Sequence, residues 1–196
     1  MEKAIKHNAK KFKKRVCPIP YMRYGIKLWE GLALCTAMQD VDLIIESGTA
    51  QGRSTEILAR YFTKPIITVD TAIAYGVELT ANAIKRLHEH SHLRFIRGDS
   101  MSVIPRIVDE YSNISIGVFI DGPKGLWARL LTNLIMPRVD VVAVHDIWTD
   151  CLWAGTHPDL YWQSTREFAE KYSYLELESD PEHPLGTGIG ILRRRT

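Results

Sequence analysis

The stretch that most constrains the fold is residues 41–52, where an apolar run leads into a turn with two glycines. Residues 43–45 (Leu-Ile-Ile) are typical of a strand buried on both faces of a parallel sheet. Gly48 and Gly52 follow, and apolar residues then recur at helical spacing. A strand, a glycine turn and a helix form the first part of a βαβ unit, whose turn presents backbone N–H groups to a ligand.

The turn can be compared with three ligand-binding loops. A phosphate-binding loop reads G-x-x-x-x-G-K-[ST], but Gly48 and Gly52 are one residue too close together and Arg53 replaces the lysine. A dinucleotide fingerprint reads G-x-G-x-x-G, and Ala50 and Arg53 replace two of its glycines. The pattern E-x-G-x-x-x-G is matched by residues 46–52. The alternative is a tight turn whose glycines serve geometry alone, and the motif by itself leaves it open.

The rest of the chain repeats the alternation of strand and helix. Four further apolar runs end in polar residues, and they cover residues 65–70, 93–97, 114–121 and 139–146. Two late strand patterns, over 172–177 and 187–192, indicate an antiparallel ending. This order predicts a doubly wound, Rossmann-like α/β domain with a mostly parallel sheet of seven strands and an antiparallel last strand.

Ligands of open α/β sheets bind at the carboxyl edge, so the residues at the strand ends are candidates for a site. Asp70 stands where a carboxylate can accept hydrogen bonds from ribose hydroxyls, although such residues also form turns and helix caps. Asp99 or Ser100 could likewise cap the following helix. His145 could be a general base near neutral pH, a metal ligand, or a histidine satisfied within the fold, and these interpretations stay open.

Taken together, the motifs over residues 41–192 resemble the class I S-adenosylmethionine-dependent methyltransferases, nearest their small-molecule O-methyltransferase branch. The resemblance implies that S-adenosylmethionine (SAM) is the cofactor, with Asp70 at its ribose and Asp99 at its adenine. The residues it assigns to cofactor binding are Glu46, Ser47, Gly48, Gly52, Ser54, Asp70, Asp99, Ser100 and Asp121.

The same resemblance implies a catalytic group of Asp121, His145 and Asp146. These residues would bind a divalent metal, Mg²⁺ or Mn²⁺, or remove the proton of the acceptor hydroxyl. The metal-dependent branch commonly carries Asp-Asn or an acidic pair where this chain has His145-Asp146. Oxygen ligands suit Mg²⁺ and imidazole shifts the preference towards softer ions, so the departure weakens the case for magnesium.

The function predicted from the resemblance is methyl transfer to a hydroxyl of a small molecule or sugar. One alternative is an NAD-dependent oxidoreductase, which the broken dinucleotide fingerprint argues against. The other is a non-catalytic binding module that recruits an anionic partner through a basic N-terminal arm over residues 1–22, ahead of a single domain over 23–196. Between residues 3 and 15 the arm carries seven Lys or Arg, which are either solvated or a contact for an anion.

Two further segments could border the site. An amphipathic helix is predicted over residues 24–38, with Leu28, Leu32 and Cys35 on one face. Trp29 and Glu30 in this helix would line a pocket or take part in packing. An aromatic loop over residues 147–160 and a helix over 161–171 complete the predicted elements.

The composition indicates which kinds of binding partner and which cellular compartment to expect. A chain of 196 residues with 45% hydrophobic and 24% charged residues fits one globular domain. The net charge of +2 argues against a nucleic-acid partner for the body of the protein. Three separated cysteines suggest neither a disulfide framework nor a zinc cluster, and no apolar run is long enough for a membrane span. We therefore expect a cytoplasmic protein with a small-molecule methyl acceptor, and a homo-oligomer stays open.

Overall fold

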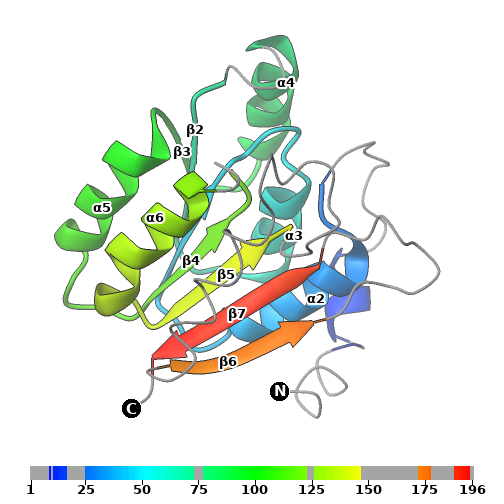
Figure 1. Cartoon of the computed structure of the whole chain (residues 1–196). Coiled ribbons are helices and arrows are strands. Elements are labelled where there is room, and N and C mark those ends of the chain that lie inside the picture. Colours follow the sequence, from blue (N-terminus) through cyan, green and yellow to red (C-terminus); the bar gives the residue numbers. More distant parts are fainter. Residues whose placement is uncertain are drawn as a thin grey trace.

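The structure, a computed structural model, describes most of residues 25–146 and parts of the segments on either side. The described residues are 9, 11–16, 25–72, 77–122, 126–146, 172–177 and 188–194. The predicted aromatic loop over 147–160 and helix over 161–171 lie outside them. Within them, seven strands form one sheet in the order β3-β2-β1-β4-β5-β7-β6 (Figure 1).

The strands are short and match the predicted runs. They are β1 (Leu43–Ser47), β2 (Ile66–Asp70), β3 (Leu93–Arg97), β4 (Ile116–Ile120), β5 (Val141–His145), β6 (Tyr172–Leu177) and β7 (Ile189–Arg194). β1 to β5 pair in parallel, whereas β7 runs antiparallel to both β5 and β6. The predicted fold class, including the antiparallel last strand, is confirmed.

Helices cover both faces of the sheet. They are α2 (Leu28–Ala37), α3 (Arg53–Tyr61), α4 (Val77–Leu87), α5 (Ser100–Glu110) and α6 (Leu126–Ile135), followed by the 3-10 turn η1 (Met136–Arg138). Figure 1 shows α5 and α6 on one side of the sheet, and α2 and α3 on the other. Strand side chains alternate between these two layers: Ile44 packs with α2 and α3, while its neighbours Leu43 and Ile45 pack with α5 and α6.

Helix α2 matches the sequence prediction in part, because Cys35 is fully buried and Leu32 packs against the core. Leu28, expected on the inner face, is 41% exposed. Besides Cys35, the buried residues include Glu30, Ala33, Leu34 and Ala37, whose spacing follows the helical repeat. The small alanines let the helix approach β5 and β7, which it contacts, and this brings Glu30 into the interior.

Part of the basic N-terminal segment packs against the domain. Residues 11–16 are helical, and Phe12 and Val16 are buried in the core beside α2 and α3. Arg15 donates a hydrogen bond of 2.7 Å to the backbone oxygen of Tyr61. Its apolar side chains therefore tie this short stretch to the sheet's α2 and α3 layer.

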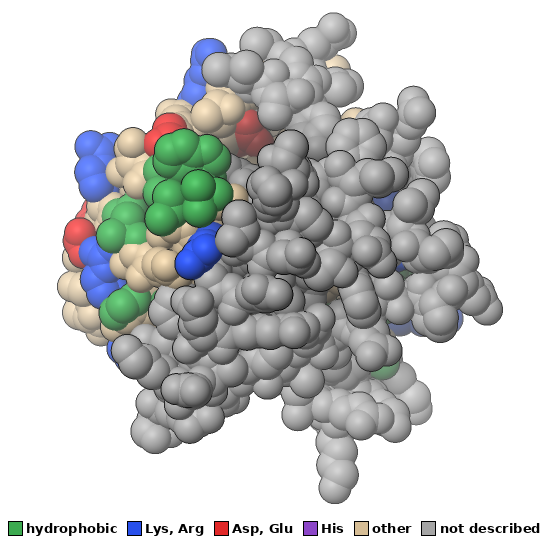
Figure 2. All heavy atoms as spheres, in the orientation of Figure 1, with side chains coloured by type: hydrophobic (Ala, Val, Ile, Leu, Met, Phe, Trp, Pro, Cys, Tyr) green, Lys and Arg blue, Asp and Glu red, His purple; other side chains and the backbone are tan. Residues whose placement is uncertain are grey.

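Helix α6 is amphipathic but also exposes apolar side chains. Ala128, Leu131 and Ile135 are buried against the sheet. The outer side carries a hydrophobic patch, visible in Figure 2, made by Leu126, Trp127, Leu130 and Leu134. No described helix, α6 included, has the length and hydrophobicity that crossing a membrane requires.

The sequence order of the strands reverses between β1 and β4, and their loops meet there. Gly48, directly after β1, has φ +93°, and a Cβ on it would lie 2.7 Å from the backbone nitrogen of Gly122. The backbone nitrogens of Asp121 and Gly122 donate to the carbonyl oxygen of Ser47 at 2.8 and 2.9 Å. Gly48 is therefore needed both for its left-handed backbone and for this close approach.

We predict that Gly48→Ala lowers the free energy of unfolding by roughly 2–4 kcal/mol, because the side chain meets backbone and φ is unfavourable. Urea denaturation of the purified variant measures the change. Gly122→Ala is the matched control, since its Cβ would lie 3.7 Å from the Cα of Gly48, an ordinary contact. Equal losses in the two variants would contradict this account.

Candidate functional site

The predicted site residues lie along one edge of the sheet, in an order set by its topology. Asp99 follows β3, Asp70 ends β2, the glycine loop follows β1, Asp121 follows β4 and His145 ends β5. The reversal between β1 and β4 leaves the crevice at which open α/β sheets bind ligands. One half of the edge thus carries the predicted cofactor residues, and the other carries the predicted catalytic group.

Asp70 holds the glycine loop and the loop after β2. Its Oδ2 accepts a hydrogen bond of 2.8 Å from the backbone nitrogen of Ala50, and its Oδ1 accepts one of 2.6 Å from that of Ala72. Both alanines have positive φ, 46° and 64°, a conformation that costs a non-glycine residue about 1–2 kcal/mol. The carboxylate offsets this cost, and each of its oxygens retains capacity for another donor.

Glu46 lies in β1, just before the glycine loop. It is fully buried, and its Oε2 accepts from the hydroxyls of Thr55 and Thr68, the latter at 2.7 Å. The pKa of Glu46 is raised to about 7: burial raises it most, hydrogen bonds, among them one from Ser54, lower it, and the negative charge of Asp121 raises it. Ser54 and Glu46, both predicted cofactor residues, thus contact each other in a buried hydrogen-bond network.

The other predicted cofactor residues have clear structural partners. The hydroxyl of Ser47 donates to the carbonyl oxygen of Gly122. A Cβ on Gly52, whose φ is +78°, would lie 3.0 Å from Leu87 of α4. Asp99 is the N-cap of α5, where its carboxylate accepts from the nitrogen and hydroxyl of Ser102 at 3.0 and 2.8 Å, and Ser100 begins that helix. Their contacts with a cofactor stay predictions.

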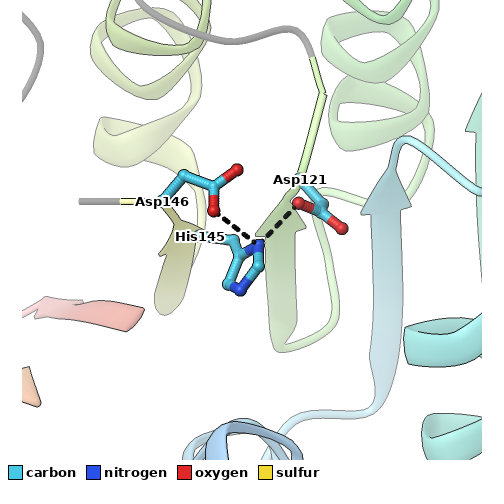
Figure 3. A group of neighbouring side chains, drawn as sticks. All are labelled: Asp121, His145 and Asp146. Atoms are coloured by element: carbon cyan, nitrogen blue, oxygen red, sulfur yellow. Dashed lines mark hydrogen bonds and ion pairs between the residues drawn. The ribbon is translucent and has the colours of Figure 1, made fainter. Parts of the chain in front are cut away.

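The predicted catalytic residues converge, as Figure 3 shows. His145 Nδ1 lies 2.8 Å from Asp121 Oδ1 and 3.3 Å from Asp146 Oδ1. His145 and Asp146 are buried, at 4% and 6% exposed, while Asp121 is partly exposed at the edge of the group. Asp146 adopts φ +62°, which turns the chain just after β5. Two adjacent residues thereby direct their side chains to the same place, which consecutive residues of a strand cannot do.

Glu30 is a fourth member of the group, one that the sequence did not assign to it. Its Oε2 lies 3.3 Å from His145 Nε2 and accepts a hydrogen bond of 2.6 Å from the backbone nitrogen of Lys27. The second contact caps the start of α2, because the Glu30 carboxylate accepts from the nitrogen of the N-cap residue, although Lys27 is not the Ser or Thr of the usual capping-box sequence. The contact with His145 joins residues 115 positions apart, so no local signal could have revealed it.

The electrostatics of the group decide what His145 can do. Burial by itself lowers the pKa of His145, but the charges of Asp121 and Asp146, with hydrogen bonds to Asp121 and Glu30, outweigh it and raise the pKa to about 10. An imidazolium has no lone pair for another proton. At neutral pH this arrangement therefore does not favour the general-base role considered for His145.

The donor atoms fit a divalent metal. Asp121, His145 and Asp146 each offer one ligand atom, and these atoms all lie within 4.8 Å of one another. The group joins one imidazole to three carboxylates, those of Glu30, Asp121 and Asp146, and carboxylate oxygens are common ligands of divalent cations. An ion bound here would replace the proton on Nδ1 and leave Nε2 on Glu30, the carboxylate–histidine arrangement common behind metal ligands.

We predict that the ionisation of Glu46 opposes folding. The raised pKa means that Glu46 contributes stability below its ordinary pKa of 4.5, which is lost as the pH rises through about 7. Glu46→Gln keeps the oxygen acceptor but cannot ionise. Relative to wild type, the variant should therefore gain up to about 3 kcal/mol of unfolding free energy between pH 4.5 and pH 8. Urea denaturation across this range measures the difference, and a constant difference would contradict the prediction.

Comparisons with known proteins support the fold. No protein-family model matches the sequence, and no curated protein matches it by sequence. Among solved structures, the chain shares its fold with several methyltransferases, as the resemblance implied. A Podospora anserina methyltransferase with bound S-adenosylhomocysteine (SAH) has TM-score 0.65 and 13% identity, over 100% of this chain and 97% of that one. An O-methyltransferase of Streptomyces achromogenes in complex with SAM has TM-score 0.65 and 17% identity, over 100% and 91%. The SAH complex of a Bacillus cereus O-methyltransferase has TM-score 0.64 and 16% identity, over 99% and 92%.

Proposed function

We propose that this protein transfers a methyl group from SAM to a hydroxyl of a small molecule. The observation that carries the proposal is the contact between Gly48 and Gly122, which sets the glycine loop beside the Asp121–His145–Asp146 group at the sheet's switch point. A cofactor at the loop would have its reactive end next to those side chains. The solved structures of the same fold include proteins bound to SAM and SAH, which supports the choice of cofactor.

The cofactor would lie across the loops after β1, β2 and β3. The backbone at Gly48 leaves room for close approach, and Asp70 retains acceptor capacity towards ribose hydroxyls. Asp99 and Ser100 would approach the adenine ring from the end of β3. The local charges at the site also suit this ligand, because the group around His145 is rich in carboxylates and SAM carries a positive sulfonium.

In the reaction, the acceptor oxygen forms a bond to the methyl carbon while the carbon–sulfur bond breaks, and the hydroxyl proton must leave. Alignment of the oxygen and the sulfonium is the main contribution expected of the protein. Asp121 and Asp146 would hold the acceptor hydroxyl near the methyl group, and one of these carboxylates would accept its proton. A divalent metal held by Asp121, His145 and Asp146 would supply Lewis-acid polarisation of that hydroxyl.

The proposal is tested by binding and turnover. We expect SAH to bind with micromolar affinity in calorimetry and NAD to give no heat. With SAM and a panel of hydroxylated acceptors, mass spectrometry should detect a methylated product. Asp146→Asn should lower kcat by roughly a hundredfold. The control is Asp140→Asn, which should leave kcat unchanged, because Asp140 lies at the opposite edge of the sheet and accepts a hydrogen bond from Ser115. Binding of NAD without SAH would overturn the proposal.

The role of Asp70 can be separated from its effect on the loops. SAH and its 2′-deoxy analogue would be titrated into wild type and Asp70→Asn. If Asp70 accepts a hydrogen bond from the 2′-hydroxyl of the ribose, substituting Asp70 or removing that hydroxyl should each weaken binding about tenfold. Making both changes together should then weaken binding little more than either change alone. Losses that multiply would show that Asp70 acts only by holding the backbone at Ala50 and Ala72.

A further inference from the structure

Glu30 is the member of the buried group that the proposed function does not use. It is fully buried, so its carboxylate depends on protein donors. These donors include the backbone nitrogen of Lys27 at 2.6 Å and His145 Nε2 at 3.3 Å. A fully buried charge is costly unless it is paired, and the imidazole ring is an ionisable partner in reach.

The two nitrogens of His145 have different surroundings. Nε2 points to Glu30 on α2, inside the protein, while Nδ1 points to Asp121 and Asp146 at the edge of the sheet. An ionised carboxylate can only accept, so Nε2 carries a hydrogen for Glu30. Glu30 therefore sets the orientation of the ring and makes Nδ1 the nitrogen that a ligand at the edge would meet.

We propose that Glu30 is the positioning residue of a metal site made by His145 Nδ1 and one oxygen each of Asp121 and Asp146, and that this site prefers Mn²⁺ to Mg²⁺. The inference deepens the proposed function, and it rests on that function only for the role of the bound ion in methyl transfer. A carboxylate behind a histidine ligand raises the basicity of the ring and holds its direction. A nitrogen donor suits transition metals, whereas Mg²⁺ prefers oxygen and keeps much of its water.

A purely structural role for Glu30 makes a different prediction. As the third residue of α2, Glu30 also caps the helix through Lys27. Glu30→Gln retains the oxygen acceptor for that cap but removes the charge behind His145. The matched control is Glu56→Gln, because Glu56 is also a buried glutamate but contacts Arg60, Arg86 and His90.

The experiment titrates Mn²⁺ into the protein without cofactor or acceptor and follows free Mn²⁺ by electron paramagnetic resonance, with Mg²⁺ as competitor. We expect Mn²⁺ to bind at least about tenfold more tightly than Mg²⁺. Glu30→Gln should weaken Mn²⁺ binding by about 10- to 100-fold, and Glu56→Gln should not change it. Absence of Mn²⁺ binding, equal affinity for the two ions, or wild-type affinity in Glu30→Gln would overturn the inference.

A second variant keeps the test decisive if Glu30→Gln does not fold, which circular dichroism would reveal. His145→Asp converts the donor set to oxygen alone, and it should reduce the preference for Mn²⁺ over Mg²⁺ to near unity. An unchanged preference would overturn the inference. SAH binding is measured on the same samples. If the wild-type protein binds SAH but not Mn²⁺, only the inference about the metal site is overturned. If the wild-type protein does not bind SAH, the proposed function is overturned.

Discussion

The contact between Gly48 and Gly122 is the constraint on which the site depends. Neighbouring strands of a parallel sheet lie about 4.8 Å apart, and their loops normally diverge to opposite faces where the strand order reverses. Here the two loops touch, because one has no side chain and the backbone of the other donates to Ser47. The glycine loop and Asp121 are consequently held side by side.

The second defining feature is a buried imidazole among three carboxylates. Removing such a group from water is costly, and the charges repay that cost only when their hydrogen bonds are made. His145 makes contacts through both nitrogens, with Glu30 on one side and Asp121 and Asp146 on the other. Three carboxylates around one imidazole distinguish this group from a simple ion pair, and they are the reason for proposing a cation, whether a metal or a sulfonium, at this edge.

Much of the fold could be predicted because its signals are local. Apolar runs bounded by polar strand ends define β1 to β5, and the parallel arrangement follows from the helices between them. The strand ends then predict that Asp121, His145 and Asp146 meet, since parallel strands finish at one edge. Helix α2 shows the limit of this reasoning. Apolar spacing assigned Leu28 to the inside, but the small residues Ala33 and Ala37 decide which face can approach the sheet.

The sequence by itself determined the order of elements, the left-handed turn at Gly48 and the set of polar residues at the carboxyl edge. These follow from periodicity and from backbone sterics, which act over a few residues. Only the tertiary structure decided that Glu30 contacts His145, that Asp70 accepts hydrogen bonds from two loops, and that Glu46 is fully buried. Those outcomes depend on which helix face packs on the sheet and on how far water is excluded, and both are set by contacts between residues far apart in the chain.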